Sequence, residues 1–291
     1  MRGRATETII FPFSFREFLR HRGVKPPDDP AFTPKARRSQ LEKLFREYLA
    51  VGGFPEAQGL EPRDRLPLLQ SYVDAVIFRD VIERHGITNV VVLRRLTRQL
   101  LGAATGMFSI HRFLNDLRSQ GVTAAKDTLH AMLAHLEDAF LVRLVPLATS
   151  SERQRQSNPR KVYPIDAGLI AAFDRSGKSN LGHALETAVL VELERRGGER
   201  GYVRTPEGFE VDFLATPGAG KPTLIQVCAD LADPLTRDRE FRALQAVRLL
   251  HRRVPALLLT LATSDAAAAQ AEAPKGIRVQ AAWEWLLMNE E

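Results

Sequence analysis

The sequence predicts a protein of mixed α and α/β class, in which a helical region with a winged helix-turn-helix precedes an α/β domain. Apolar side chains recur every three or four residues through much of residues 35–139, which indicates amphipathic helices. After Ile165, apolar runs of strand length are interspersed with helical segments. We therefore expect an N-terminal strand and helical region (1–89), a winged-helix-like domain (90–165) and an α/β domain (166–291).

Composition restricts the class of protein. The chain has 291 residues, enough for two or three domains, and 44% of them are hydrophobic, which is ordinary for a globular protein. No apolar run approaches the roughly 20 residues of a membrane span. The N-terminus lacks the pattern of a signal peptide, and the single cysteine, Cys228, excludes an internal disulfide. These features predict a cytoplasmic protein with no membrane partner.

The positive charge is concentrated in the middle of the chain. Between Arg84 and Val162 there are 12 Lys and Arg side chains and 5 Asp and Glu, whereas the whole chain has 41 and 35. This segment therefore holds the entire excess of +6. Clustered basic charge suits a polyanion such as DNA, although a solvated basic face explains it equally well.

The first region is expected to begin with a strand, Thr6–Pro12. Ser14, followed three residues later by Glu17, forms a capping-box pattern at the start of a helix. Proline-rich and glycine-rich stretches separate the helices that follow. The expected helices are Phe15–Arg22, Lys35–Ala50 and Arg63–His85.

The middle region is expected to contain three helices and a β-hairpin, which is the composition of a winged helix. The helices are Val90–Ala103, Ile110–Ser119 and Ala124–Ala139, and the strands are Leu141–Leu147 and Lys161–Ile165.

In a winged helix the third helix would enter the major groove of DNA. The polar side chains of this helix are Lys126, Asp127, His130 and His135, which are a poor set for reading base pairs. The polar loop Thr149–Arg160 is better suited to touch phosphates. Winged helices also serve as protein-binding spacers, so both DNA and a protein remain candidate partners. The residues expected to contact DNA are Lys126, Arg153, Arg155, Arg160 and Lys161.

The last region alternates between helices and strands. The segment Ala256–Leu261 is wholly apolar, as expected for a strand buried on both faces. The expected helices are Leu181–Arg196, Thr236–Arg252 and Ser264–Ala273 (as helix or loop). The expected strands are Tyr202–Arg204, Phe209–Ala215, Thr223–Cys228 and Ala256–Leu261. Two short segments, Ile277–Gln280 and Trp283–Leu287, close the chain.

Acidic residues in this region form a metal-site pattern. Glu210 and Asp212 share one face of a strand because side chains alternate along it. With Glu186 on the preceding helix and Gln226 on the next strand, they reproduce the layout of restriction-endonuclease-like sites. Glu186, Asp212 and Gln226 would supply oxygen ligands to Mg²⁺ and act as the catalytic residues. However, glutamine brings no charge, and Cys228 stands where such sites place a lysine.

Other chemistry is not indicated. The stretch Ser176–Ser179 ends like a phosphate loop but has Ala172 where the first glycine is required, and Pro222 follows the similar Gly218–Lys221. ATP binding is therefore not expected. None of the seven histidines has the spacing of a zinc ligand pair.

Taken together, the chain resembles the C-terminal portion of a large prokaryotic family of AAA-type P-loop ATPases with a C-terminal domain of unknown function. The resemblance implies an upstream ATPase domain, of which Arg2–Arg4 would be the end, a winged-helix linker and a restriction-endonuclease-like domain. The stretches that carry it run nearly end to end: Gly3–Thr6, Pro12–Leu19, Tyr48, Gly52–Glu56, Phe78–Asp80, Tyr163–Asp166, Gly168, Gly182, Glu186, Glu210–Phe213, Gln226, Val227, Arg239 and Glu240.

Three functions follow from these observations. The first is a module without its own ATP site that binds DNA or a protein partner and carries a degenerate nuclease-like domain. The second is an active Mg²⁺-dependent nuclease. The third is a structural protein-interaction module, in which the long helix Arg63–His85 would hold an oligomer together.

Overall fold

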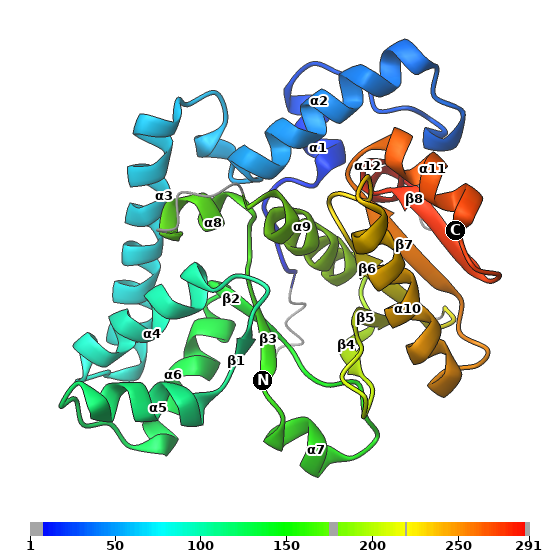
Figure 1. Cartoon of the computed structure of the whole chain (residues 1–291). Helices are drawn as coiled ribbons and strands as arrows, with labels where there is room; N and C mark the ends of the chain where they lie inside the picture. Colours follow the sequence, from blue (N-terminus) through cyan, green and yellow to red (C-terminus); the bar gives the residue numbers. More distant parts are fainter. Residues whose placement is uncertain (1–7, 175–179, 219, 289–291) are drawn as a thin grey trace, which may run out of the picture.

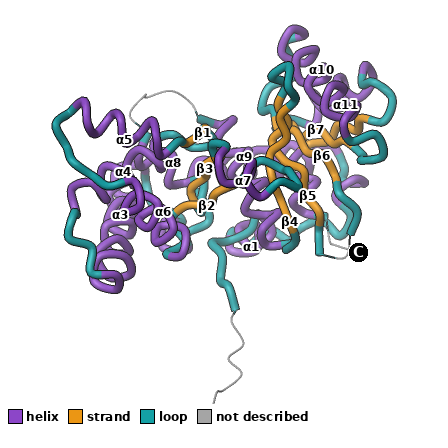
Figure 2. The backbone as a smooth tube through the Cα atoms, turned by 90° about the horizontal axis from the view of Figure 1, so that it is seen from below, coloured by secondary structure: helices purple, strands orange, loops and turns teal. Residues whose placement is uncertain are grey.

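The computed structural model describes residues 8–174, 180–218 and 220–288, which form a mixed α/β protein with two β-sheets. Figures 1 and 2 show a helix-rich half beside a half built on the larger sheet. Among the described residues, no helix combines the length and apolar composition that a bilayer crossing requires. The stretches Arg2–Arg4 and Ser176–Ser179 lie outside the described residues, as does Ala219 in the predicted turn Gly218–Lys221.

The N-terminal helix α1 (Phe15–His21) begins at the predicted capping box. The Ser14 hydroxyl accepts a hydrogen bond from the Glu17 N–H at 3.2 Å, and the Glu17 carboxylate accepts one from the Ser14 N–H at 2.7 Å. The strand predicted for Thr6–Pro12 is wrong over residues 8–12, which pair with no neighbouring strand. Instead, the Arg195 side chain donates to the carbonyl of Pro12 at 2.8 Å. The other elements here are η1 (Pro30–Phe32), α2 (Lys35–Val51) and η2 (Pro55–Ala57).

The helix-rich half is built around one long helix and a small sheet. Helix α3 (Pro62–Val76) continues into a π-helical segment, η3 (Ile77–Glu83), so the predicted helix Arg63–His85 changes its hydrogen bonding midway. The three-stranded sheet is antiparallel, in the order β1-β3-β2. The remaining elements are α4 (Val90–Gly102), β1 (Met107–Phe108), α5 (Ile110–Ser119), α6 (Lys126–Asp138), β2 (Val142–Val145), α7 (Glu152–Ser157), β3 (Arg160–Pro164) and α8 (Gly168–Phe173).

The second half contains a five-stranded sheet in the order β4-β5-β6-β7-β8. Strands β4, β5 and β6 pair antiparallel, and β6, β7 and β8 pair parallel. Every residue of β7 is buried, as its apolar sequence predicts. The elements are α9 (Leu181–Arg195), β4 (Glu199–Arg204), β5 (Glu210–Thr216), β6 (Thr223–Val227), α10 (Pro234–Leu250), β7 (Ala256–Thr260), α11 (Thr263–Glu272), β8 (Ile277–Ala281) and α12 (Ala282–Leu287).

Buried apolar side chains form two clusters, and strand β3 lies between them. Val162 belongs to the cluster of the helix-rich half, whereas Tyr163 belongs to that of the larger sheet. Alternation along the strand explains this division, because neighbouring side chains point to opposite faces. Phe15 and Phe45 of the N-terminal helices also join the larger-sheet cluster. The two clusters therefore divide the chain differently from the three predicted domains, 1–89, 90–165 and 166–291. That division into domains stays a prediction.

A buried carboxylate connects two glycine-containing turns. Asp166 accepts hydrogen bonds from the N–H groups of Gly53 (2.6 Å) and Gly168 (2.9 Å). Gly52 has φ +84°, and a Cβ atom there would lie 1.9 Å from Oδ1 of Asp166, so only glycine fits. Burial raises the pKa of Asp166 to about 6, while the two backbone hydrogen bonds act in the opposite direction. These residues have a structural role, and they belong to three of the sequence stretches that carry the resemblance.

Candidate functional site

The predicted acidic residues surround a lysine from a different part of the chain. Lys161 Nζ lies 2.7 Å from Asp212 Oδ1, 3.0 Å from Glu210 Oε1 and 3.2 Å from Glu186 Oε1. The lysine side chain is 5% exposed, and those of Asp212, Glu186 and Glu210 are 9%, 13% and 32% exposed. Glu210 therefore lies nearest the solvent, and the ammonium group sits among three carboxylates.

Local structure explains why these side chains meet. Lys161 and Tyr163 are two residues apart on β3 and so share the face that looks toward the larger sheet. Both contact the same oxygen of helix α9, since the Tyr163 hydroxyl donates to Glu186 Oε1 at 2.7 Å. Glu210 and Asp212 share a face of β5, as the sequence predicts. The site thus joins the two halves of the protein.

The third predicted ligand, Gln226, lies beside the cluster but is engaged elsewhere. Its Oε1 accepts from the backbone N–H of Asp212 at 3.2 Å, and its Nε2 donates to Glu240 Oε2 at 2.8 Å. The second carboxylate oxygen of Asp212 accepts from the N–H of Val227 at 2.8 Å. Gln226 therefore fixes the neighbouring strand and helix α10, and Asp212 has partners at both of its oxygens.

Charge is unevenly distributed in the cluster, with one ammonium group against three carboxyl groups. Burial and the neighbouring Asp212 raise the pKa of Glu186 to about 7, although Lys161 and Tyr163 favour its ionised form. Burial alone would lower the pKa of Lys161, but the three carboxylates outweigh it and raise that pKa above its ordinary value. The lysine is consequently a permanent cation at physiological pH, which excludes it as a nucleophile or general base in this arrangement.

The arrangement does not fit a resident Mg²⁺ ion. The described residues include no group of three or more His, Cys, Asp or Glu side chains that could hold a metal. The ammonium of Lys161 takes the position between the carboxylates that a cation would need. Cys228, at the position expected for a lysine, is partly buried and its thiol lies 3.2 Å from the carbonyl of Asp230. An amine is therefore present at the site, but it comes from β3.

The residues predicted to contact DNA lie in different environments. Lys126 is exposed at the start of α6, Arg153 and Arg155 are exposed on α7, and Arg160 is partly buried at the start of β3. The prediction for Lys161 does not fit its placement, because a buried ammonium among carboxylates cannot reach a phosphate. Four of the five side chains thus remain available to a polyanion.

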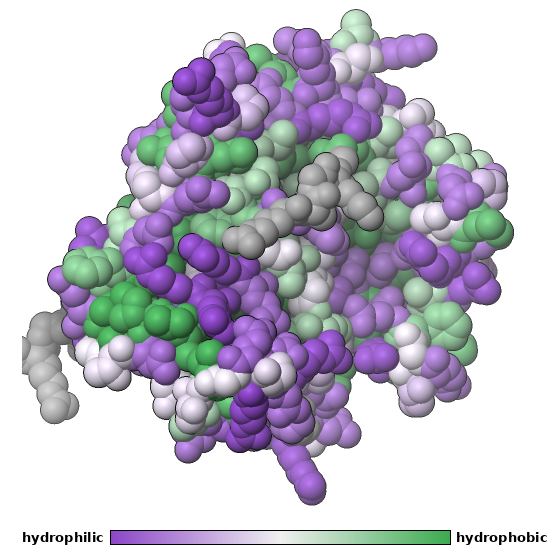
Figure 3. Space-filling view, turned by 60° about the vertical axis from the view of Figure 1, so that its left-hand side comes forward, coloured by the Kyte–Doolittle hydropathy of each residue, from purple (hydrophilic) through white to green (hydrophobic). Residues whose placement is uncertain are grey.

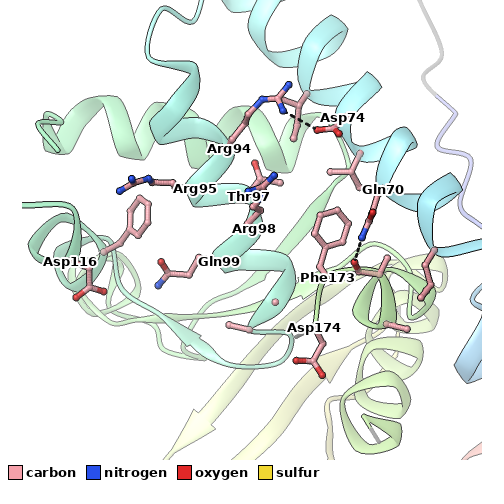
Figure 4. Close-up of a pocket in the computed structure, with 18 of the residues that line it drawn as sticks. Gln70, Asp74, Arg94, Arg95, Thr97, Arg98, Gln99, Asp116, Phe173 and Asp174 are labelled. Carbon is pink, nitrogen blue, oxygen red and sulfur yellow. Dashed lines mark hydrogen bonds and ion pairs between the residues drawn. The ribbon is translucent and has the colours of Figure 1, made fainter. Parts of the chain in front are cut away.

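A separate hollow of about 1020 Å³ lies between helices α3, α4, α5 and α8. Figure 4 shows Arg94 directed toward Asp74, with 3.7 Å between their charged atoms, and Arg95 on the other side of α4. The lining includes three arginines and three aspartates, so its charge does not select an anion or a cation. The face of the molecule in Figure 3 shows hydrophilic and hydrophobic residues intermixed.

Comparison with known proteins reveals relatives without an assigned activity. Residues 42–180 match a domain of unknown function, DUF8612. This range contains Lys161 and Asp166 but ends before Glu186.

Two curated relatives extend over more of the chain. An uncharacterised protein of Methanocaldococcus jannaschii is 31% identical over 252 residues, which cover 84% of this chain and 54% of the relative. An uncharacterised protein of Haemophilus influenzae is 26% identical over 214 residues, which cover 73% of this chain and 50% of the relative. The chain thus spans about half the length of the curated relatives it matches. No solved structure matches it.

Proposed function

We propose that the chain is a DNA-binding module with a winged helix and a restriction-endonuclease-like domain that does not cleave DNA. The observation that carries this proposal is the ammonium group of Lys161, which lies between Glu186, Glu210 and Asp212. Metal-dependent nucleases use such carboxylates to hold Mg²⁺, which activates water and polarises phosphate. Here the chain supplies its own cation, and the third ligand position is a neutral Gln226 that is bonded elsewhere.

The order of elements supports the winged-helix part of the proposal. Helices α4, α5 and α6 are followed by β2 and β3, and the short β1 completes a three-stranded antiparallel sheet. The segment between β2 and β3 corresponds to a wing, and it carries the exposed Arg153 and Arg155. Helix α6 has Lys126 as its only Lys or Arg, against three acidic residues, so phosphate contact through the wing is favoured over base readout by α6.

The larger sheet supports the nuclease-like part. Helix α9 precedes a sheet in which β4, β5 and β6 are antiparallel, and α10 connects the parallel strands β6 and β7. Glu186, Asp212 and Gln226 lie on α9, β5 and β6, as in the layout that the sequence suggests. In this proposal ATP hydrolysis belongs to a separate AAA-type domain, since the resemblance implies one and this sequence has no complete phosphate loop.

Binding and cleavage of labelled duplex DNA test the proposal together. Fluorescence anisotropy across a KCl series should show binding whose logarithm falls linearly with the logarithm of salt concentration. Incubation with Mg²⁺ or Mn²⁺ should leave the DNA intact, both for the wild type and for Asp212→Ala. Binding that is absent or independent of salt would contradict the DNA-binding function.

An active Mg²⁺-dependent nuclease is the second candidate, and one observation favours it. Lys161 places an amine 2.7 Å from Asp212, so β3 could supply the lysine that such sites need and that position 228, a cysteine here, does not provide. Activity would require the ammonium to withdraw from the carboxylates. Cleavage by the wild type that is lost in both Asp212→Ala and Lys161→Met would establish this candidate over the first.

A further inference from the structure

A smaller hollow, of about 250 Å³, lies where the wing meets the larger sheet. The wing, which runs from β2 to β3, contributes Pro146–Ser150 and Arg155 to its lining. The other half contributes Gly201 of β4, Thr216 of β5 and His251, the residue after α10. In Figure 1, α7 and one end of α10 lie along the lower edge of the molecule. The hollow therefore brings the wing next to the C-terminal end of α10.

Hydrogen bonds fix the wing to β4 at this place. The N–H of Tyr202 donates to the carbonyl of Pro146 at 2.9 Å, and the N–H of Ala148 donates to the carbonyl of Tyr202 at 2.7 Å. At the other end of the wing, the Tyr202 hydroxyl donates to the carbonyl of Pro159 at 2.8 Å. A Cβ atom on Gly201 would lie 2.9 Å from the Pro146 oxygen, so glycine permits this close approach. The wing and the larger sheet thus form one continuous surface.

A tight turn carries two arginines on the larger-sheet side of the hollow. The turn His251–Val254 is closed by a hydrogen bond from the N–H of Val254 to the carbonyl of His251 at 3.0 Å. Arg252 and Arg253 occupy its two central positions and are both exposed. Neither guanidinium group has a hydrogen bond or an ion pair with any described residue. The turn therefore presents two uncompensated positive charges to the solvent next to the hollow.

The wing presents a second pair of arginines. Arg155 lines the hollow, and Arg153 precedes it on the same short helix, α7. Both are exposed, and within the described part of the chain their guanidinium groups likewise have no hydrogen-bond or ion-pair partner. The acidic residues in the described lining and on α7 are Glu199 and Glu152. Four arginines against two carboxylates leave this surface positively charged, and the charge comes from both halves of the protein.

We propose that the backbone of duplex DNA crosses this hollow, so that Arg252 and Arg253 bind phosphates on one side while the wing binds them on the other. This inference rests on the proposed function and adds a second contact site, on the larger-sheet half, to the wing. Arginine suits this role because its charge persists at any physiological pH and its planar fork pairs with phosphate oxygens. Phosphate contacts on two sides of the hollow would fix the position of the duplex without reading its sequence.

This path keeps the DNA backbone away from the carboxylate cluster. The hollow lies at the Thr216 end of β5, whereas Asp212 lies four residues back along the strand. At about 3.3 Å per residue, this separation is about 13 Å. A phosphate held at the hollow therefore cannot contact Asp212, which agrees with binding without cleavage.

Fluorescence anisotropy of labelled duplex DNA across a KCl series tests the proposal with the full chain. The turn variant, Arg252→Gln/Arg253→Gln, should reduce the slope of log affinity against log salt by about 2, because two phosphate contacts are lost. The control variant, Arg20→Gln/Arg46→Gln, also removes two exposed arginines, but from α1 and α2 at the opposite edge of the molecule in Figure 1. It should leave the slope unchanged.

Two further variants separate phosphate contact from other effects of substitution. Arg252→Lys/Arg253→Lys keeps both charges and should keep the wild-type slope. Adding the wing variant, Arg153→Gln/Arg155→Gln, to the turn variant should reduce the slope by about 4, since both sides contact the same duplex.

Four results would overturn the proposal. A wild-type slope in the turn variant, with a reduced slope in the wing variant, would confine the DNA to the wing and leave the proposed function standing. Equal reductions in the turn and control variants would show an effect of net charge alone. A reduced slope in the lysine variant would show that the turn acts through its conformation and not its charge. A wild type without salt-dependent DNA binding would refute both this inference and the proposed function.

Discussion

Replacing Lys161 with methionine tests whether this lysine neutralises the buried carboxylates. Removing one partner of a buried ion pair costs about 3–5 kcal/mol, because the other charge stays buried. We assign this range to the loss of the pairs with Asp212 and Glu186, whose side chains are 9% and 13% exposed. We add nothing for Glu210, which is 32% exposed and screened by solvent. At about 2–4 °C per kcal/mol, the Tm of Lys161→Met should fall by about 6–20 °C at neutral pH.

The stability that Lys161→Met loses relative to the wild type, its stability deficit, should depend on pH. This dependence distinguishes lost charge compensation from lost packing. In the wild type the pKa of Glu186 is about 7, raised from an ordinary value of 4.5, and losing the cation raises it further. A raised folded-state pKa stabilises the protein at low pH, and that stability is lost as pH rises through the folded-state value. The loss of stability in Lys161→Met should therefore be smaller at pH 5 than at pH 8.

Urea unfolding followed by circular dichroism at both pH values measures the deficit. Lys126→Met, which removes an exposed lysine, is the matched control and should change stability little. A deficit of Lys161→Met that is absent at pH 8, or that is equal at pH 5 and pH 8, would refute the reasoning.

Three further variants extend the account. Gly52→Ala and Gly23→Ala both place alanine at a positive φ, and this backbone strain alone costs about 1–3 kcal/mol. Only Gly52→Ala also places a Cβ atom against a buried carboxylate, so in urea unfolding it should destabilise the protein by at least about 1 kcal/mol more than Gly23→Ala. Equal losses of stability would contradict this. Glu186→Gln should gain stability relative to the wild type between pH 5 and pH 8, since the variant lacks the carboxyl group whose ionisation near pH 7 costs stability, whereas Asp166 ionises in both proteins; parallel stability curves would argue against it. Replacing both Arg153 and Arg155 with glutamine should reduce the salt slope of DNA binding by about 2, as two phosphate contacts are lost, and an unchanged slope would exclude α7 from the interface.

Local sequence signals predicted much of the fold. Helix α5 occupies the expected residues, Ile110–Ser119, because its apolar period and the Ser109 cap both lie within one short stretch. The capping box at Ser14 was predictable for the same reason. Helix α7 lies where the sequence predicts a loop, because Glu152–Ser157 has no apolar side chain that would indicate a helix. Its start is set by Ser151, which accepts from the N–H of Gln154.

The candidate site was only partly predictable, because its central residue is distant in sequence. Alternation places Glu210 and Asp212 on one face without knowledge of the fold, but Lys161 is separated by 25 and 51 residues from Glu186 and Asp212. Its positive charge suggested a phosphate contact instead. One signal could have corrected this interpretation: Lys161 opens an apolar strand, Lys161–Ile165, and a lysine in such a strand requires buried acidic partners.

Calorimetric titration of Mn²⁺ into the wild type, Lys161→Met and Asp212→Ala tests the central claim most directly. If Lys161 supplies the cation of this site, the wild type and Asp212→Ala should bind no Mn²⁺, whereas Lys161→Met should bind it saturably and gain stability from it. Saturable Mn²⁺ binding by the wild type that disappears in Asp212→Ala would contradict the claim and favour the nuclease.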